Sequence, residues 1–305
     1  MNFELFLYFC NMKVFHQLVR DLLPAYPESE ARALARWVCE ELCGLSQTDI
    51  LLDKDNHLSA EVLAKVEEIT SRLLRHEPIQ YILGAVEFCN HRFLVGPGVL
   101  IPRPETAELV RSVIDSCMNG HQRDIHRSGH NPSFSILDIG TGSGCIALSL
   151  ALALPFAAVT GWDVSNEALA VARSNARLYP EVNVTFGQTD ILSTTETPCQ
   201  WDIIVSNPPY VRQSEAAAMS ENVLKHEPHQ ALFVPDDDPL LFYRAIARFA
   251  QTGLKTDGQL WFEINEALGK ETAELIEEMG FTEVDVYKDL YGKDRILKAR
   301  NQRKD

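Results

Sequence analysis

Two spacings of apolar residues divide this chain into regions of different character. Between Phe15 and about His76, apolar residues recur every three to four positions, which is the spacing of amphipathic helices. From Phe134 onward, short apolar runs alternate with helical stretches, and such alternation predicts a parallel, doubly wound α/β sheet. We therefore expect a small bundle of three to five helices followed by a larger α/β domain.

Two β-rich runs and several prolines connect the two regions. The runs 86–88 and 92–95 flank the polar pair Asn90-His91, which predicts a hairpin. The spaced prolines between 96 and 106 predict a stiff, extended segment, after which Thr106 could cap a helix. The expected domains are 12–83 (helical), 84–104 (hairpin and proline-rich linker) and 105–305 (α/β).

Within the α/β region, six strands and a closing edge strand are expected. Asp238-Pro239 resembles a helix N-cap followed by proline at the first helical position. The polar stretch 119–133 is expected to be a solvated loop, and its three histidines leave a metal site as the alternative. The expected strands are 135–139, 157–162, 182–186, 201–206, 259–264, 281–287 and, at the edge, 296–299.

Charge and cysteine content narrow the classes of function. The chain of 305 residues has a net charge of −15, which argues against broad electrostatic binding to nucleic acid. Its seven cysteines are scattered and contain no Cys-x-x-Cys pair, as expected of a protein in the reducing cytoplasm. Cys39 and Cys43 share a helix face and are expected in the core. No apolar run approaches the ~20 residues of a membrane helix, and we interpret residues 1–11 as an upstream extension outside the fold.

The tetrapeptide Asn207-Pro208-Pro209-Tyr210 follows directly on the apolar run 201–206. Ligands of an open α/β sheet bind beyond the carboxyl ends of its strands, so this tetrapeptide lies at the edge where chemistry is expected. Both prolines restrict the backbone, which holds the Asn207 side chain and the Pro208 carbonyl in one place. A simple strand exit remains the structural alternative, because Asn-Pro commonly opens turns.

A glycine-rich loop follows the first α/β strand. Residues 140–144 have the pattern Gly-x-Gly-x-Gly, which differs from the Gly-x-Gly-x-x-Gly of dinucleotide binders. Asp163 ends the next strand, about 20 residues on, where an acid can bind ribose hydroxyls. Asp190 lies just past the third strand, where it could meet the amine of an adenine. Asp138 could order the loop or contact a ligand ammonium, and each of these acids could also be a solvated strand end.

Together these residues resemble known enzymes. Asp138 to Gly144 followed by Asp163 resembles the S-adenosylmethionine site of the class I methyltransferases, and the tetrapeptide resembles their motif for methylating a planar nitrogen. With the stretches 78–84 and 100–106, the chain resembles the protein-(glutamine-N5) methyltransferases of peptide chain release factors. The resemblance covers about 15–300 and implies a Rossmann-like, mostly parallel seven-stranded sheet behind a helical release-factor-docking domain.

The resemblance also implies the substrate, the cofactor and the site. The substrate would be the side-chain amide of the glutamine in the Gly-Gly-Gln motif of class 1 release factors, and the cofactor S-adenosylmethionine, with no metal. The Asn207 side-chain oxygen and the Pro208 carbonyl would accept the two amide hydrogens, and Tyr210 would pack against the amide plane. Asn207, Pro208 and Tyr210 would be catalytic and, with Pro209, would bind substrate. Cofactor would contact Gly140, Thr141, Gly142, Ser143, Gly144, Asp163, Asp190 and Asn207.

Two departures and several alternatives accompany the resemblance. Ile191 stands where family members often carry an aromatic residue, and 236–238 replace an expected glycine-rich turn. A glutamine methyltransferase of a ribosomal protein, or an enzyme methylating amino groups of DNA or RNA bases, remains possible on these motifs. A nicotinamide dehydrogenase would need another glycine spacing, and a non-catalytic protein would be expected to have lost Asn207 or the glycines. We expect a monomer that binds neither nucleic acid nor membrane.

Overall fold

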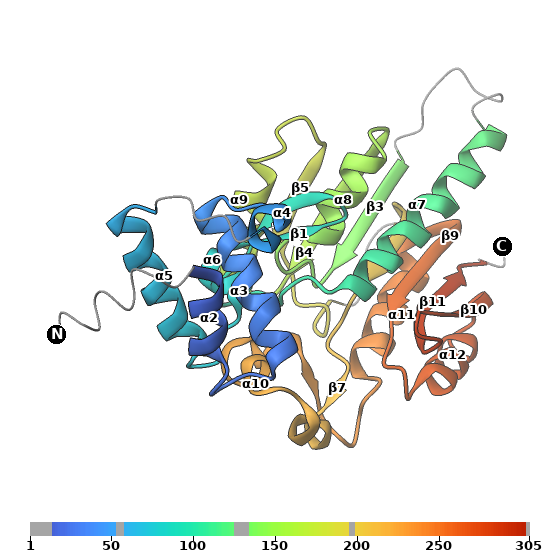
Figure 1. Cartoon of the computed structure of the whole chain (residues 1–305). Helices are drawn as coiled ribbons and strands as arrows, with labels where there is room; N and C mark the ends of the chain where they lie inside the picture. Colours follow the sequence, from blue (N-terminus) through green and yellow to red (C-terminus); the bar gives the residue numbers. More distant parts are fainter. Residues whose placement is uncertain (1–13, 53–57, 125–133, 195–198, 303–305) are drawn as a thin grey trace, which may run out of the picture. The chain divides into compact units, whose positions relative to one another are not determined.

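The computed structural model describes residues 14–52, 58–124, 134–194 and 199–302, with only the backbone for 119–124. The predicted extension 1–11 therefore lies outside the described residues. The chain forms two compact units (Figure 1). The first contains the described residues up to Leu83 together with Glu221–His226, and the second contains Gly84–Ser220 and the described residues from Glu227.

Helices alone build the described part of the first unit. Four of them fall between Phe15 and His76, as predicted. Cys39 and Cys43 are both buried in the core of this unit, which confirms their expected position. Gly44 ends the longest helix in the left-handed conformation, with φ of 63°, as helix C-caps commonly do. The helices are α2 (Val14–Leu22), α3 (Glu28–Cys43), α4 (Gln47–Leu51), α5 (Ala60–Leu73), α6 (Ile79–Leu83) and α10 (Glu221–His226).

The second unit begins with the predicted hairpin. Strands β1 (Ala85–Phe88) and β2 (His91–Leu94) pair antiparallel. The turn is Cys89-Asn90, one residue earlier than predicted, and both residues have positive φ, at 50° and 62°. This is the backbone of the tight two-residue turns that match the twist of paired strands.

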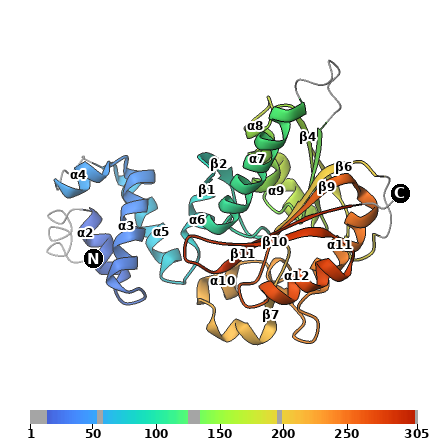
Figure 2. The same cartoon turned by 90° about the vertical axis from the view of Figure 1, so that its right-hand side faces the viewer.

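A seven-stranded sheet forms the centre of the second unit, which confirms the predicted fold class (Figure 2). The strand order is β10-β11-β9-β6-β3-β4-β5. Neighbours from β9 to β5 pair in parallel, whereas β11 pairs antiparallel with both β9 and β10. The strands are β3 (Phe134–Ile139), β4 (Ala157–Asp163), β5 (Val184–Gln188), β6 (Trp201–Ser206), β9 (Leu254–Glu263), β10 (Thr282–Lys288) and β11 (Asp294–Arg300).

The strand predicted at the edge is an interior strand. β11 lies between β10 and β9, so that β10 is the edge strand on this side of the sheet. Ile296, Leu297 and Ala299 are 0–2% exposed, because β9 and β10 cover the two edges of this strand and side chains of the helices cover both of its faces. The tight turn at 289–293, in which the Asp289 N–H donates to the Lys293 carbonyl at 2.8 Å, folds β11 back between strands that precede it.

Helices cover both faces of the sheet (Figures 1 and 2). Side chains of a strand point alternately to opposite faces, and the neighbours Ile136 and Leu137 accordingly belong to different cores. The Ile136 core contains residues of α7 and α8, and the Leu137 core contains residues of α11 and α12. The helices are α7 (Pro104–Asp124), α8 (Cys145–Ala153), α9 (Asn166–Ala176), α11 (Leu241–Gly253) and α12 (Gly269–Glu278). None of the helices the structure describes could cross a membrane.

Short elements after the tetrapeptide complete the unit. The parallel pair β7 (Val211–Arg212) and β8 (Phe233–Val234) was not predicted, because two residues are too few for a periodic pattern. The 3₁₀ helices are η1 (Gln213–Ala218) and η2 (His229–Ala231).

Both predicted caps are wrong. Thr106 lies inside α7, which begins at Pro104, and its hydroxyl reaches a side chain on another element. Helix α11 begins at Leu241, because the Asp238 carboxylate pairs with Arg244 at 2.9 and 3.0 Å instead of capping. Thr106 thus bonds a residue 157 positions away and Asp238 a residue six positions on, and neither side chain caps its helix.

The prediction of a loop at 119–133 is also partly wrong. Helix α7 continues to Asp124, so 119–124 are helical where a loop was predicted. His126 and His130 lie outside the described residues. No cluster that could hold a metal ion occurs in the part of the chain that the structure describes.

Candidate active site

The glycine loop and the tetrapeptide emerge side by side from adjacent strands. Ile139 and Ser206, the last residues of β3 and β6, are paired in parallel register, and the Ser206 hydroxyl donates to the Ile139 carbonyl at 2.6 Å. A Cβ atom placed on Gly140 would lie 4.0 Å from the Asn207 carbonyl oxygen. The two motifs, far apart in sequence, therefore lie together at the carboxyl edge of the sheet.

The glycine loop needs its glycines for backbone conformation and for space. Gly140, Gly142 and Gly144 have φ values of 74°, 55° and 80°, a region that side chains with a Cβ rarely adopt. A Cβ on Gly144 would also lie 3.1 Å from that of Ala172. Backbone N–H groups of Gly140 and Thr141 both donate to the Trp162 carbonyl, at 2.8 and 2.9 Å, which ties the loop to β4.

Asp163 holds the glycine loop from the end of β4. Its Oδ2 accepts from the Gly142 N–H at 2.9 Å and its Oδ1 from the Ser165 N–H at 2.8 Å. Burial raises the pKa of the Asp163 carboxyl above its usual value, against the effect of these hydrogen bonds. The structure thus gives Asp163 a loop-ordering role in addition to the ribose contact predicted for it.

Asp138 lies beneath the loop and is fully buried. Its Oδ2 accepts from the Thr141 hydroxyl at 2.7 Å and from the Ala147 N–H at 3.2 Å. Its Oδ1 has no hydrogen-bond partner among the described residues. Burial raises the pKa of this carboxyl to about 7. Through the two bonds to Oδ2, Asp138 orders the loop, and its Oδ1 remains available as an acceptor.

Asp190 is exposed just beyond β5. Its Oδ1 accepts from the Leu192 N–H at 2.9 Å, which fixes a turn. β5 pairs with β4 so that Gln188 faces Asp163, and Asp190 therefore lies at the same edge of the sheet. Ile191, which stands where an aromatic residue was expected, is buried.

Side chains of α7, of β9 and of Asn265 just after β9 hold the tetrapeptide. Asn207 is half-buried, and its Nδ2 donates to the Thr106 hydroxyl oxygen at 3.1 Å. The Tyr210 hydroxyl donates to Glu263 Oε1 at 3.0 Å, and the Tyr210 carbonyl accepts from Asn265 at 3.1 Å. The tetrapeptide is thus fixed at both ends. Pro208 is buried and Pro209 half-buried.

Glu263 is a buried carboxylate that the sequence analysis passed over. It ends β9 and is 1% exposed. Its Oε2 accepts from the Thr106 hydroxyl at 2.7 Å, and its Oε1 accepts from Tyr210. Burial raises the pKa of Glu263, whereas these two hydroxyls and the charge of Arg295 lower it. Part of the signal was available, because Glu263 lies near the carboxyl end of the predicted strand 259–264; the structure adds that this strand pairs with the strand before Asn207.

Comparison with known proteins decides the family. The PrmC N-terminal domain model matches 14–84 and the Methyltransferase small domain model matches 126–232. A release factor glutamine methyltransferase of Bacteroides thetaiotaomicron is 47% identical over 92% of this chain and 96% of its own. Those of Flavobacterium psychrophilum (45%; 93% and 96%) and Streptococcus pneumoniae (37%; 88% and 91%) are also similar. The chain belongs to the release factor glutamine methyltransferase family. Its cofactor is accordingly S-adenosylmethionine.

Two further residues of the methyltransferase support the glycine loop and were not predicted. The amide of the buried Asn175 donates to the Ser143 carbonyl at 2.8 Å and to the Leu94 carbonyl at 3.0 Å, which joins the loop to the hairpin. A Cβ on Gly161 of β4 would lie 2.7 Å from both the Phe186 ring and the Thr141 hydroxyl oxygen. Neither residue belongs to a motif, so only the fold reveals its role.

The linker arginine and the acidic turn have structural partners in the methyltransferase. Arg103 donates to the buried Glu227 at 2.6 Å, and Glu227 also accepts from the Ile101 N–H at 3.2 Å. Asp236 accepts from the Ser214 N–H and hydroxyl at 3.0 and 2.8 Å. Side-chain acceptors therefore shape the turn where a glycine-rich sequence was expected.

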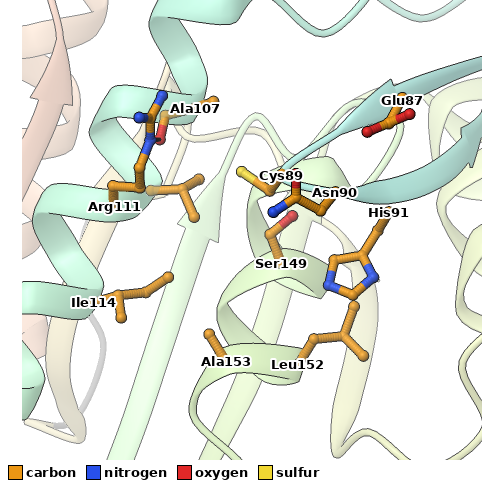
Figure 3. A pocket seen from close by; sticks show the side chains of 11 residues that line it. Glu87, Cys89, Asn90, His91, Ala107, Arg111, Ile114, Ser149, Leu152 and Ala153 are labelled. Atoms are coloured by element: carbon orange, nitrogen blue, oxygen red, sulfur yellow. Dashed lines mark hydrogen bonds between the residues drawn. The ribbon is translucent and has the colours of Figure 1, made fainter.

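A separate cavity of about 590 Å³ opens on the side of the hairpin turn. Figure 3 shows Cys89 and Asn90 of the turn and His91 of β2 above Ser149 and Leu152 of α8, with Arg111 and Ile114 of α7 beside them. None of the predicted site residues lines this cavity, so it is separate from the residues predicted to form the site.

Proposed function

We propose that this enzyme methylates the glutamine of the Gly-Gly-Gln motif in class 1 peptide chain release factors at the site formed by the glycine loop and the Asn207 tetrapeptide. The adjacency of Gly140 and Asn207, with 4.0 Å between a Cβ placed on Gly140 and the Asn207 carbonyl oxygen, carries this proposal. A methyl donor held by the loop and an amide held by the tetrapeptide would then meet at one edge of the sheet.

The loop residues fit S-adenosylmethionine. Glycines at alternate positions leave the backbone open to a close approach by the ligand, and the unused Asp138 Oδ1 is an acceptor suited to an ammonium group. When bound, the cofactor supplies a methyl group already activated by a sulfonium. We assign Asp163 to the ribose of the cofactor and Asp190 to its adenine amine. The remainder of the cofactor would be bound by Gly140, Thr141, Gly142, Ser143, Gly144 and Asn207.

The tetrapeptide would hold the reacting amide of the substrate in position. A carboxamide nitrogen is a poor nucleophile because its lone pair is delocalised into the carbonyl. The Asn207 Oδ1 and the Pro208 carbonyl would accept its two hydrogens and so favour positive charge developing on nitrogen. Pro209 and Tyr210 would pack against the amide plane. Alignment of this kind can contribute roughly 7–11 kcal/mol, and the proton can leave nitrogen after transfer, so no side-chain base is needed.

The helical domain 12–83 is proposed to dock the release factor, with 84–104 as linker and 105–305 as the catalytic domain. The matching PrmC N-terminal domain model supports this division. We further propose a monomer that acts in the cytoplasm on protein and not on nucleic acid. The net charge of −15 supports the last point, because a nucleic-acid groove needs positive charge.

Incubation with purified class 1 release factors and methyl-labelled cofactor, followed by peptide mapping, tests the proposal. We expect label on the motif glutamine, and none when that glutamine is replaced by alanine in the release factor. Label on another residue, or preferential labelling of ribosomal protein, DNA or RNA in parallel reactions, would overturn it. Light scattering of the purified enzyme tests the monomer.

A further inference from the structure

We infer that Thr106 and Glu263 are positioning residues that set which way the Asn207 side-chain amide faces. The inference rests on the proposed function, in which Asn207 offers its oxygen to the substrate. An asparagine amide has an oxygen acceptor and a nitrogen donor of similar size at its tip. A site that needs the oxygen must therefore exclude the rotated form.

The orientation of the Asn207 amide is determined first by the buried carboxylate of Glu263. Both oxygens of Glu263 accept a hydroxyl hydrogen, Oε1 from Tyr210 at 3.0 Å and Oε2 from Thr106 at 2.7 Å. This is the pattern of an ionised carboxylate, which can only accept. The two hydroxyls and the charge of Arg295 favour that form and oppose the effect of burial, which raises the pKa of Glu263. Glu263 is 1% exposed and Thr106 3% exposed, so bulk water does not compete for these bonds.

The direction of the Thr106–Glu263 hydrogen bond in turn fixes the direction of the hydrogen bond between Thr106 and Asn207. A threonine hydroxyl has one hydrogen, and Thr106 gives it to Glu263. Toward Asn207 the Thr106 oxygen can therefore only accept, and it does so from Nδ2 at 3.1 Å. The rotated amide would place two acceptors against each other, and the bond would be lost. Oδ1 is consequently the polar atom left for the substrate amide.

The same carboxylate also holds the other end of the tetrapeptide through Tyr210. The residues that supply this network lie on α7, β9 and the tetrapeptide, and the Thr106–Glu263 pair spans 157 positions of sequence. One buried acid thereby fixes both the Asn207 amide and the Tyr210 ring.

Three threonine variants test the inference by activity. Thr106→Val removes the hydroxyl at nearly constant shape and should lower kcat about tenfold, the equivalent of one hydrogen bond, while KM for cofactor stays within twofold. Thr106→Ser keeps the hydroxyl and should restore most of kcat. Thr272→Val is the matched control, because Thr272 of α12 is also buried and donates its hydroxyl to the carbonyl of Leu268, the N-cap of that helix; its kcat should not change.

A carboxylate variant tests the direction of the bonds. Glu263→Gln introduces an NH₂ group that can face Thr106. The Thr106 hydrogen would then be free for Asn207 Oδ1, and the amide would turn. We expect kcat to fall by a factor similar to that of Thr106→Val, and no further loss when the two changes are combined. Additive losses would contradict a shared role.

A readout independent of turnover separates this inference from the proposed function. In enzyme labelled with ¹⁵N-asparagine, the side-chain NH₂ signal of Asn207, identified by its loss in Asn207→Ala, should show one hydrogen-bonded proton. Thr106→Val should shift this signal toward that of exposed amides, and Thr106→Ser should not. An unshifted signal in Thr106→Val, or unchanged kcat, overturns the inference. Failure of the unaltered enzyme to methylate release factors overturns the proposed function instead.

Discussion

At Asn207, two polar atoms of similar size and opposite hydrogen-bonding character lie at the tip of one side chain, and the proposed chemistry uses only the oxygen. The half-buried side chain is held through its nitrogen, so the oxygen is available without movement of the backbone. Preorganised acceptors of this kind act on charge that develops during the reaction. Removal of the side chain therefore affects the reaction more than it affects binding of the methyl donor.

Asn207→Ala should lower turnover of release factor by about 100-fold or more, the scale of losing one preorganised polar contact to the transition state. Cofactor affinity should remain within a few-fold, because the glycine loop and Asp163 are intact. Methyl transfer from labelled cofactor and calorimetric titration with cofactor measure the two quantities. Retention of most activity would exclude the acceptor role.

Asp138 should make the stability of the cofactor-free enzyme depend on pH. Its pKa is about 7 in the folded protein, raised by burial, and a protonated carboxyl is therefore favoured by folding. This contribution is complete below about pH 4 and is lost as pH rises through about 7. Between pH 5 and pH 8, the free energy of unfolding should fall by about 3 kcal/mol on this account.

Urea unfolding of the enzyme and of Asp138→Asn over that pH range checks the sign. Asparagine does not titrate, so the difference between the two stabilities should change with pH in the direction given. Parallel curves for the two proteins would show that Asp138 is ionised throughout and that the buried charge is stabilised by its neighbours.

The sequence analysis identified the site residues that belong to short motifs. It missed those that the fold brings to the site from distant parts of the chain. Asn207 and the glycines were predicted from their own neighbours. Thr106 was predicted as a helix cap, because the partner of its hydroxyl, Glu263, is 157 positions away. No local pattern contains that information; the parallel pairing of β6 with β9 brings Glu263 to the edge where Asn207 lies, and the packing of α7 brings Thr106 there.

At the scale of elements, the glycine loop depends on the strand that lies under it. β4 provides the Trp162 carbonyl that accepts from Gly140 and Thr141, and Gly161 leaves the space that Thr141 and Phe186 fill. A close-packed interior tolerates little added volume. The loop can therefore be disturbed from a position that never meets the ligand.

Gly161→Ala should destabilise the fold by about 1–3 kcal/mol through overpacking and should weaken cofactor binding, because the new Cβ would displace Thr141. Gly187→Ala is a matched control in β5, where the Cβ would lie at an ordinary 3.4 Å from the Trp162 ring. Thermal unfolding and cofactor titration of both variants test this difference. Equal effects of the two changes would contradict the role assigned to Gly161.

Element types were more predictable than element ends and positions. Trp201–Ser206 was predicted to the residue, since a continuous apolar run defines a strand buried on both faces. The position of β11 was not, because apolar spacing shows that a strand is covered but not which neighbours cover it. The start of α11 was also missed, since the Arg244 partner of Asp238 lies on the helix itself.

At the scale of the whole chain, net charge and exposed apolar residues favour a protein over a nucleic acid as the proposed partner. A net charge of −15 disfavours nucleic acid, and the helical unit exposes large apolar side chains. Leu51 and Leu52, at the end of α4, are 84% and 61% exposed. Such residues at a docking surface would contribute to binding of a protein substrate without contact to the reacting groups.

The double change Leu51→Ser and Leu52→Ser should raise KM for the release factor at least threefold, with kcat and cofactor affinity unchanged. Leu290→Ser is the matched control, because Leu290 lies in the second unit and is likewise 84% exposed. Steady-state kinetics with varied release factor measure the effect. If the control raises KM as much as the double change, docking is not specific to the helical domain.

The interior position of β11 has a consequence for synthesis of the protein. β9 ends at Glu263 and β11, its partner, begins only at Asp294. At translation rates of about 5–20 residues per second, the nascent chain carries β9 for a few seconds before that partner has been made. During this interval the backbone groups along Leu260, Trp261 and Phe262 have an open edge, and open strand edges template aggregation. Rapid insertion of β11 would therefore limit the time in which this edge could pair with another chain.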